Sequence, residues 1–64
     1  MKKHTLTKRE KEISKLIADG ESCIEIAEKI SVKISTVRSH VRNIHYKTNT
    51  RTLPQLVVFI REQR

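Results

Sequence analysis

The sequence contains little of what stabilises or interrupts many small proteins. Its 64 residues include one cysteine, one proline, one glycine, one tyrosine, one phenylalanine and no tryptophan. A single cysteine cannot form an internal disulfide, which excludes the disulfide-rich scaffolds of small secreted domains and favours a reducing compartment. Because proline and glycine are so scarce, no segment resembles a flexible linker, and we expect helices joined by tight turns.

Long hydrophobic runs are also missing. Hydrophobic residues make up 36% of the chain, and no window approaches the roughly 18 consecutive apolar residues of a membrane span. The lysine-containing start leads into no apolar core of a signal peptide. We therefore expect a soluble, cytoplasmic protein with no membrane contact, whose residues 1–64 form one domain.

Acidic residues are nearly absent from the second half of the chain. Lys and Arg number 14 against 7 Asp and Glu, which gives a net charge of +7. Residues 1–32 hold seven basic and six acidic side chains, whereas residues 33–64 hold seven basic ones and only Glu62. No acid lies between Lys33 and Arg51. Since a solvated surface usually mixes both signs, this half is expected to meet an anionic partner.

Capping boxes and apolar periodicity predict an all-α protein with helices at about residues 8–19, 23–30, 34–48 and 53–62. A hydroxyl followed three positions later by Glu or Gln marks three of the helix starts: Thr7 with Glu10, Ser22 with Glu25, and Thr52 with Gln55. The expected core residues recur at helical spacing: Ile13, Leu16, Ile17, Ile26, Ala27, Ile30, Ile34, Val37, Val41, Ile44, Thr48, Leu53, Leu56, Val57 and Ile60. Gly20 and Asn49 are expected to end the first and third helices.

The second and third predicted helices are joined by a few residues around 31–33, which is typical of a helix-turn-helix. The face of the third helix opposite its core stripe carries Ser35, Arg38, Ser39 and Arg42, with Tyr46 further along. An arginine fork can bond O6 and N7 of guanine together, and serine bonds bases or phosphates less selectively. An ordinary solvated basic face is the alternative, weakened by the absence of acids. The pattern therefore favours binding to double-stranded DNA.

No catalytic or metal-binding arrangement is evident. His40 and His45 lie five positions apart, on different faces of a helix, so a metal site that combines them with His4 and Cys23 is not expected. His40 is interpreted as a packed residue, and His45 as exposed or near a phosphate. Glu10 and Glu12 are both expected to be exposed and close to a capping role, so they are not interpreted as a catalytic pair. We expect no enzyme, no cofactor, no small-molecule ligand and no redox role for Cys23.

Taken together, these motifs resemble the DNA-binding domain of the LuxR-type (GerE-type) bacterial transcription regulators, from Leu6 to about Ile60. The matching residues are L-T-K-R-E at 6–10, Gly20 with Ser22, E-I-A at 25–27, T-V-R-S-H at 36–40, Asn43 with Ile44, Lys47, and the tail from Arg51 to Val57. The resemblance implies a four-helix domain with the second and third helices as the helix-turn-helix. It also implies that the third is the recognition helix in the major groove and that the fourth pairs two protomers.

The resemblance also implies roles for particular residues. Base contacts fall to Arg38, Ser39 and Arg42, in agreement with the helical face described above. Phosphate contacts are expected from Ser22, Lys33, Ser35, Thr36, Lys47 and Arg51. The expected interface of a homodimer on a pseudo-palindromic site consists of Pro54, Val58, Phe59 and Arg61. RNA polymerase or another regulator is a possible additional partner.

Several positions depart from the family pattern. Lys33 stands where a Ser or Thr usually caps the third helix, so Ser31 or Ser35 substitutes, the helix start frays, or the lysine grips a phosphate. Ser31 replaces a turn glycine, which requires strain or a different turn. Ile24 replaces a polar residue and is expected to be exposed. Leu53 and Pro54 replace Arg and Thr and make the fourth helix unusually apolar.

Two alternatives to a LuxR-type regulator remain open at this point. Region 4 of a bacterial sigma factor has a similar opening and a similar E-I-A helix, although T-V-R-S-H and the apolar fourth helix favour the regulator. A helix-turn-helix adaptor would instead bind a polymerase or another regulator through exposed Ile24, Val58 and Phe59, with incidental charge. A steep loss of DNA affinity with salt would separate DNA binding from the adaptor.

Overall fold

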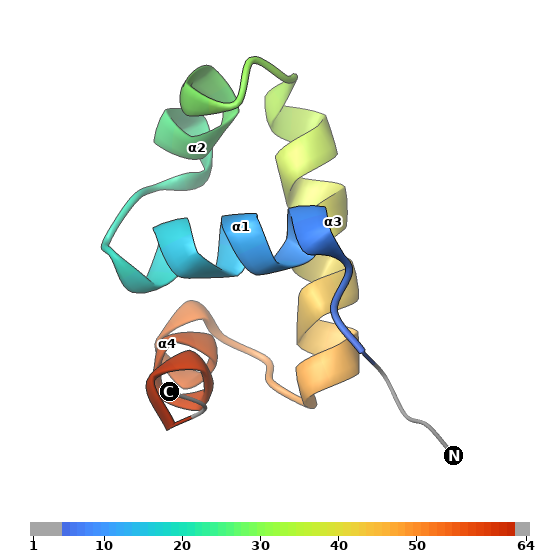
Figure 1. The fold of residues 1–64 in the computed structure, drawn as a ribbon, viewed down its shortest axis with the longest axis vertical. Coiled ribbons are helices and arrows are strands. Elements are labelled where there is room, and N and C mark those ends of the chain that lie inside the picture. The colour runs from blue at the N-terminus through green and yellow to red at the C-terminus, as the bar shows by residue number, and fades with distance from the viewer. Residues whose placement is uncertain (1–4, 63–64) are drawn as a thin grey trace.

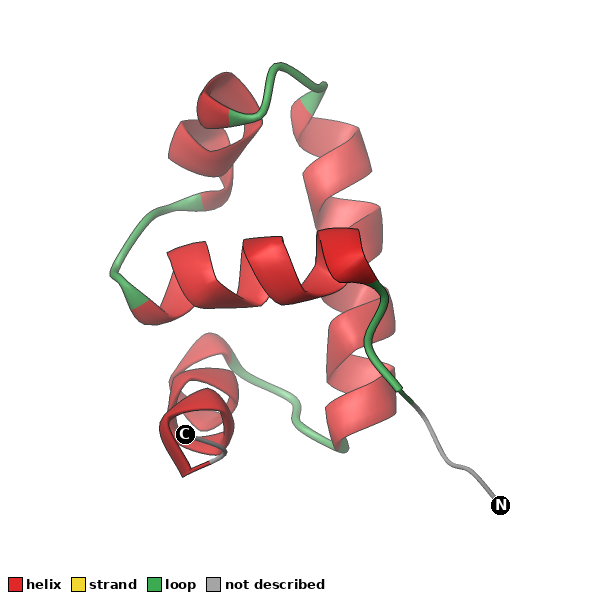
Figure 2. Cartoon of the chain, in the orientation of Figure 1, coloured by secondary structure: helices red, strands yellow, loops and turns green. Residues whose placement is uncertain are grey.

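The computed structural model describes residues 5–62, which form four α-helices and contain no strand. The helices are α1 (Lys8–Ala18), α2 (Cys23–Lys29), α3 (Ile34–Thr48) and α4 (Leu53–Glu62), as Figure 2 shows. The all-α prediction is confirmed. The predicted helix ends are correct except that α1 and α2 each stop one residue earlier than expected.

The longest helix, α3, organises the other three. Figure 1 shows α1 lying across α3, α2 beside the first turns of α3, and α4 below α1. Because α2 and α3 pack together and are joined only by residues 30–33, they form the helix-turn-helix expected from the sequence. All four helices contribute to one core, whose buried apolar residues are Ile13, Ile17, Ile26, Ala27, Val37, Val41, Ile44 and Leu56.

Two of the three predicted capping boxes are complete. At the start of α1, Thr7 Oγ1 accepts from the Glu10 N–H at 3.1 Å and the Thr7 N–H donates to Glu10 Oε1 at 2.8 Å. Ser22 and Glu25 make the same pair of bonds at the start of α2. At α4 only half of the box forms, because the Gln55 side chain reaches past Thr52 to accept from the Arg51 N–H at 2.7 Å.

The first three helices end in the same hydrogen-bonded turn, each with a residue in the left-handed conformation. These residues are Gly20 (φ 95°), Ser31 (φ 59°) and Asn49 (φ 57°). In each turn the next N–H donates back to a carbonyl five positions earlier, at 3.0 Å: Glu21 to Leu16, Val32 to Ala27, and Thr50 to His45. Of the two options for Ser31, a different turn or a strained one, the structure therefore has the strained one.

Replacing Ser31 with glycine should raise the free energy of unfolding by about 0.5–1 kcal/mol, because glycine has no Cβ that disfavours positive φ. Urea unfolding followed by circular dichroism measures the change. Ser39→Gly, at an exposed position inside α3, is the matched control and should instead lower stability by about 0.5 kcal/mol. Equal effects of the two substitutions would mean that the left-handed turn stores no strain at Ser31.

The core of α4 is smaller than its sequence pattern indicates. Leu53 was expected in the core but is 41% exposed, because it begins the helix before the stripe that meets the rest of the protein. Leu56 is fully buried, while Val57 and Ile60 are half-buried against the core. Leu16, Ile30 and Ile34 are likewise only half-buried, and Ile24 is 61% exposed, as predicted.

Candidate nucleic-acid interface

The packing of α3 fixes which of its side chains face outward. Val37 and Ile44 are completely buried and Val41 is 9% exposed, so this stripe holds the helix in one rotation against the core. The opposite face is consequently turned to solvent. The exposed residues of that face include all three predicted base contacts and two predicted phosphate contacts: Arg38, Ser39, Arg42, Ser35 and Thr36.

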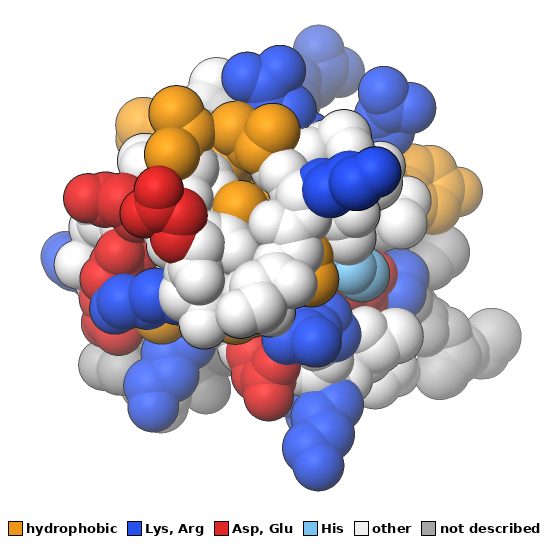
Figure 3. Space-filling model, turned by 90° about the horizontal axis from the view of Figure 1, so that it is seen from above, with side chains coloured by type: hydrophobic (Ala, Val, Ile, Leu, Met, Phe, Trp, Pro, Cys, Tyr) orange, Lys and Arg blue, Asp and Glu red, His pale blue; other side chains and the backbone are white. Residues whose placement is uncertain are grey.

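Carboxylates do not neutralise the arginines of this face. Within residues 5–62 the ion pairs are Arg9 with Glu12, Lys29 with Glu21, and Lys47 with Glu10. Arg38 and Arg42 belong to none of these pairs. Figure 3, seen from the end where α2 and the start of α3 lie, shows acidic side chains gathered at the left and a group of Lys and Arg side chains at the upper right. Lys and Arg side chains also lie among the acidic ones at the left and bottom of this view, whereas the group at the upper right has no acidic side chain beside it.

The start of α3 has no side-chain cap. Lys33 occupies the capping position in an extended conformation, and neither Ser31 nor Ser35 substitutes for a capping hydroxyl. The Lys33 carbonyl accepts from the Thr36 N–H at 3.0 Å and the Val37 N–H at 3.2 Å, so the helix still begins where it was predicted to begin. Lys33 is exposed at the positive end of the helix dipole, and the hydroxyl side chains of Ser35 and Thr36 are exposed beside it.

Lys47 has an internal partner that the sequence analysis did not anticipate. Its Nζ lies 2.8 Å from Glu10 Oε1 and 3.5 Å from the Thr5 carbonyl, and the side chains of Lys47 and Glu10 are 24% and 5% exposed. The interpretation of Glu10 as exposed is therefore wrong. A sequence signal existed, since Glu10 precedes Ile13 and Ile17 by three and seven positions and so shares their buried face.

Opposing effects act on the pKa of Glu10. Burial raises the pKa of this carboxyl group, because the charged form is disfavoured away from water. The Lys47 ammonium and the Thr7 N–H and hydroxyl groups favour the carboxylate, and together they lower the pKa below its ordinary value. Glu10 is thus held charged as the link between the first turn of α1 and the last turn of α3.

The turn between α3 and α4 is held by three side chains. Nδ1 of His45 lies 2.7 Å from Oγ1 of Thr50, which lies 2.9 Å from Oγ1 of Thr48. The Thr48 hydroxyl donates to the Ile44 carbonyl at 2.8 Å. His45 is half-buried in this network, so its interpretation as an exposed residue is wrong, while a position beside a phosphate stays a prediction. This network holds the turn that follows α3. Arg51 comes directly after the turn and is exposed.

The outer face of α4 is apolar with a basic end. Pro54 and Arg61 are exposed, Val58 is 54% exposed, and Phe59 is half-buried. Leu53, which was expected inside the protein, is also exposed, at the first position of α4. The four predicted dimer-interface residues therefore include three exposed ones on a helix that carries more exposed hydrophobic surface than expected.

A metal site, a membrane span or a reactive thiol would require other features within residues 5–62. Within residues 5–62 no three His, Cys, Asp or Glu side chains converge as a metal-binding group would require. His4 lies outside the described residues. Over the same range, no helix combines the length and the apolar character needed to cross a bilayer. Cys23 is a half-buried free thiol at the start of α2.

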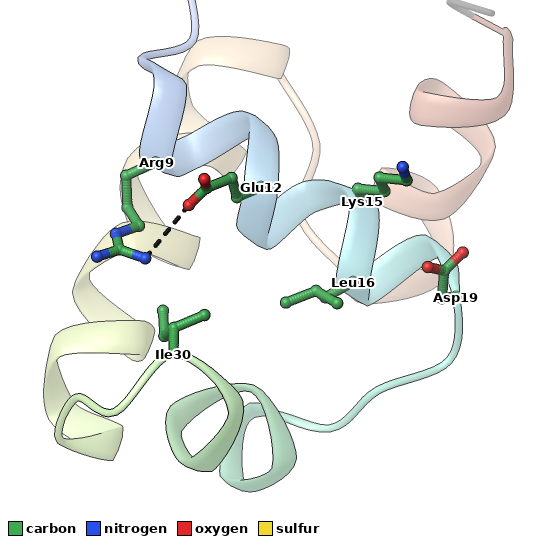
Figure 4. A pocket seen from close by; sticks show the side chains of 6 residues that line it. All are labelled: Arg9, Glu12, Lys15, Leu16, Asp19 and Ile30. Atoms are coloured by element: carbon green, nitrogen blue, oxygen red, sulfur yellow. Dashed lines mark hydrogen bonds and ion pairs between the residues drawn. The ribbon is translucent and has the colours of Figure 1, made fainter.

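An open pocket of about 560 Å³ lies between α1 and the end of α2. Figure 4 shows the side chains that line it: Arg9, Glu12, Lys15, Leu16, Asp19 and Ile30. Two of its charges, on Arg9 and Glu12, are paired at 3.2 Å. Because two cations are matched by two carboxylates, this pocket offers no net attraction to an anion and is distinct from the basic face of α3.

Comparison with known proteins identifies the chain's family. The family model of bacterial regulatory proteins of the luxR family matches residues 4–60. The chain belongs to the luxR family. Similar proteins include the oxygen regulatory protein NreC of Staphylococcus carnosus, which is 46% identical over 54 residues, and two proteins of Bacillus subtilis. These are the transcriptional regulatory proteins LiaR, 42% identical over 55 residues, and DesR, 36% identical over 58 residues.

The matches cover most of this chain but only part of each relative. They span 84% of the chain and 25% of NreC, 86% and 26% for LiaR, and 91% and 29% for DesR. The chain thus corresponds to about a quarter of the length of these relatives. The matched segment is the helix-turn-helix domain of the luxR family, which is a family of bacterial regulatory proteins. The family match also decides against region 4 of a sigma factor.

Proposed function

We propose that this domain binds double-stranded DNA at a specific sequence, as part of a bacterial cytoplasmic transcription regulator, with α3 in the major groove. The observation that carries the proposal is the acid-free outer face of α3, on which Arg38 and Arg42 are exposed and take part in none of the ion pairs of residues 5–62. Buried Val37, Val41 and Ile44 hold this face outward. A rigid helix with unpaired guanidinium groups matches the donor and acceptor pattern of base edges.

Base contacts are proposed for Arg38, Ser39 and Arg42. The two arginines are one helical turn apart, so both forks can reach the floor of the same groove. Guanine is the expected partner of each fork, because its O6 and N7 accept two parallel hydrogen bonds. Ser39, exposed between them, can bond a neighbouring base or a phosphate.

Phosphate contacts are proposed mainly at the start of α3. Lys33, Ser35 and Thr36 lie at the positive end of the helix dipole, where an anion is favoured. Ser22, whose oxygen already accepts from the Glu25 N–H at 3.2 Å, can still donate its hydroxyl proton to a phosphate. Arg51 follows the fixed turn after α3 and is proposed as the second charged contact. Lys47 is left out of the proposed set, because its ammonium is engaged by Glu10 at 2.8 Å.

Two copies are proposed to associate through α4. Pro54, Val58, Phe59 and Arg61 form the proposed contact, and exposed Leu53 extends its apolar area. A two-fold axis through this helix would present two α3 helices to successive major grooves, about 10 base pairs apart. Half-sites would then be arranged as a pseudo-palindrome.

Selection of bound duplexes from a random pool tests this arrangement directly. We expect enriched sequences with two inverted, guanine-containing half-sites whose centres are about 10 base pairs apart. A single enriched half-site would contradict the dimer and leave the groove contact standing. No enrichment at all would contradict sequence-specific binding.

Salt dependence of the affinity counts the charged contacts. If Lys33 and Arg51 each neutralise one phosphate in both protomers, the logarithm of the affinity should fall by about 3.6 for each log unit of salt. Participation of Lys47 would raise this slope to about 5.4.

The alternative function, a protein-interaction adaptor, is favoured by the 61% exposure of Ile24. A flat salt response would support that adaptor.

A further inference from the structure

The last turns of α3 expose Tyr46 more than Lys47, the residue that was expected to contact DNA. The sequence pattern assigned a phosphate to Lys47, but its Nζ is held 2.8 Å from Glu10 Oε1 and the side chain is 24% exposed. The adjacent residue, Tyr46, is 74% exposed and is the most exposed of the large hydrophobic side chains in the described part of the chain. The Tyr46 ring therefore lies on the outer face of α3, near the C-terminal end of the helix. At this end the ammonium group of Lys47 is engaged by Glu10.

Tyr46 lies on the same column of the helix as the proposed DNA contacts. It follows Ser35, Ser39 and Arg42 by eleven, seven and four positions, which are all near-whole numbers of turns. These three residues are exposed, and the buried stripe lies on the other side of the helix. Tyr46 thus faces the same surface as the residues proposed to contact bases and phosphate.

The dimensions of the groove place Tyr46 beyond the bases. At about 1.5 Å per residue, the column from Ser35 to Tyr46 extends about 16 Å, which exceeds the roughly 12 Å width of the major groove. In a helix-turn-helix the N-terminal part of the recognition helix contacts base edges. A straight helix whose first turns approach the bases leaves the curved groove at its other end, and Tyr46 lies about 6 Å past Arg42 in that direction.

We propose that Tyr46 donates its phenolic hydrogen to a backbone phosphate at the edge of the groove and so anchors the C-terminal end of α3. The inference rests on the proposed DNA-binding function and adds a contact to it. A phenol suits this role because its oxygen extends beyond an apolar ring and donates a hydrogen bond without carrying charge. Tyrosine is among the side chains that bond phosphates in protein–DNA complexes.

Tyr46→Phe tests the proposal, because it removes the hydroxyl and keeps the ring. Affinity would be measured by fluorescence anisotropy for a selected duplex and a random duplex at several salt concentrations. We expect both duplexes to be bound about three- to tenfold more weakly for each bound protomer, which is the effect of one lost hydrogen bond. The salt slope should stay unchanged, since phenol releases no counterion.

Arg51→Ala is the matched control for a charged phosphate contact and should lower the salt slope by about 0.9 for each phosphate released. Wild-type affinity of Tyr46→Phe on both duplexes would overturn the proposal. A loss confined to the selected duplex would also overturn it, because the hydroxyl would then contact a base. Failure of the wild-type chain to bind any duplex would instead overturn the proposed function.

Discussion

Alanine in place of Arg38 or Arg42 should reduce discrimination between the selected duplex and its base-substituted forms by about 1–3 kcal/mol for each arginine, or about 5- to 150-fold. Both side chains are exposed on the face of α3 opposite the core, and no carboxylate pairs with them within residues 5–62. Affinity for random duplexes should fall much less, because the phosphate contacts remain. Competition binding with single-base variants measures the change and identifies the base that each arginine contacts.

Arg9→Ala provides the comparison for this pair. Arg9 is also an exposed arginine, but it lies on α1 and its guanidinium group is 3.2 Å from Glu12. Its removal lowers the net charge equally and should leave discrimination between duplexes unchanged. Equal loss of discrimination in all three variants would assign the effect to overall charge and would refute base contact by α3.

Glu10→Gln should lower the free energy of unfolding at neutral pH by about 1.5–3 kcal/mol, the usual worth of a hydrogen bond to a charged group. The substitution leaves the Lys47 ammonium without its carboxylate at a site that is 24% exposed. A core of this size supplies only about 3–5 kcal/mol in total, so the loss is a large fraction of the stability. Urea unfolding at pH 7 measures it.

The same substitution should change how stability depends on pH. The folded-state pKa of Glu10 lies below its ordinary value, so its contribution is fully present above the unfolded-state pKa and is lost as the pH falls through the folded-state pKa. Wild-type stability should therefore decrease in acid more than that of Glu10→Gln, and the two should converge at low pH. Glu12→Gln, which breaks an exposed pair, should cost no more than about 0.5 kcal/mol. Parallel pH curves for wild type and Glu10→Gln would contradict this account.

The parts of the fold that could be predicted from sequence are those governed by local interactions. The boxes at Thr7 and Ser22 join residues three positions apart, and the left-handed turn at Asn49 depends on one residue. Leu53 was misplaced because burial depends on where α4 meets the other helices, which its own spacing does not specify. The box at Thr52 forms only in part for a different and local reason, since the Gln55 side chain accepts from the Arg51 N–H rather than from that of Thr52.

The candidate site was predictable to the extent that it follows from one amphipathic helix. The core stripe of α3 determines its outer face, so the exposure of Arg38 and Arg42 could be derived from periodicity alone. The pairing of Lys47 with Glu10 could not, because 37 positions separate the two residues. Nor could the link from His45 to Thr50, which depends on the path of the chain after α3.

The charge of the molecule is unevenly distributed, because residues 1–32 hold seven basic and six acidic side chains whereas residues 33–64 hold seven basic ones and one acid. This asymmetry makes the molecule an electric dipole. In the field of a polyanion such a molecule experiences a torque as well as an attraction. It would rotate before contact so that its more cationic half leads, because the nearly neutral half of residues 1–32 is attracted less strongly. The distribution of charge thus selects the orientation of encounter, and added salt would slow productive association even where it leaves the final contacts intact.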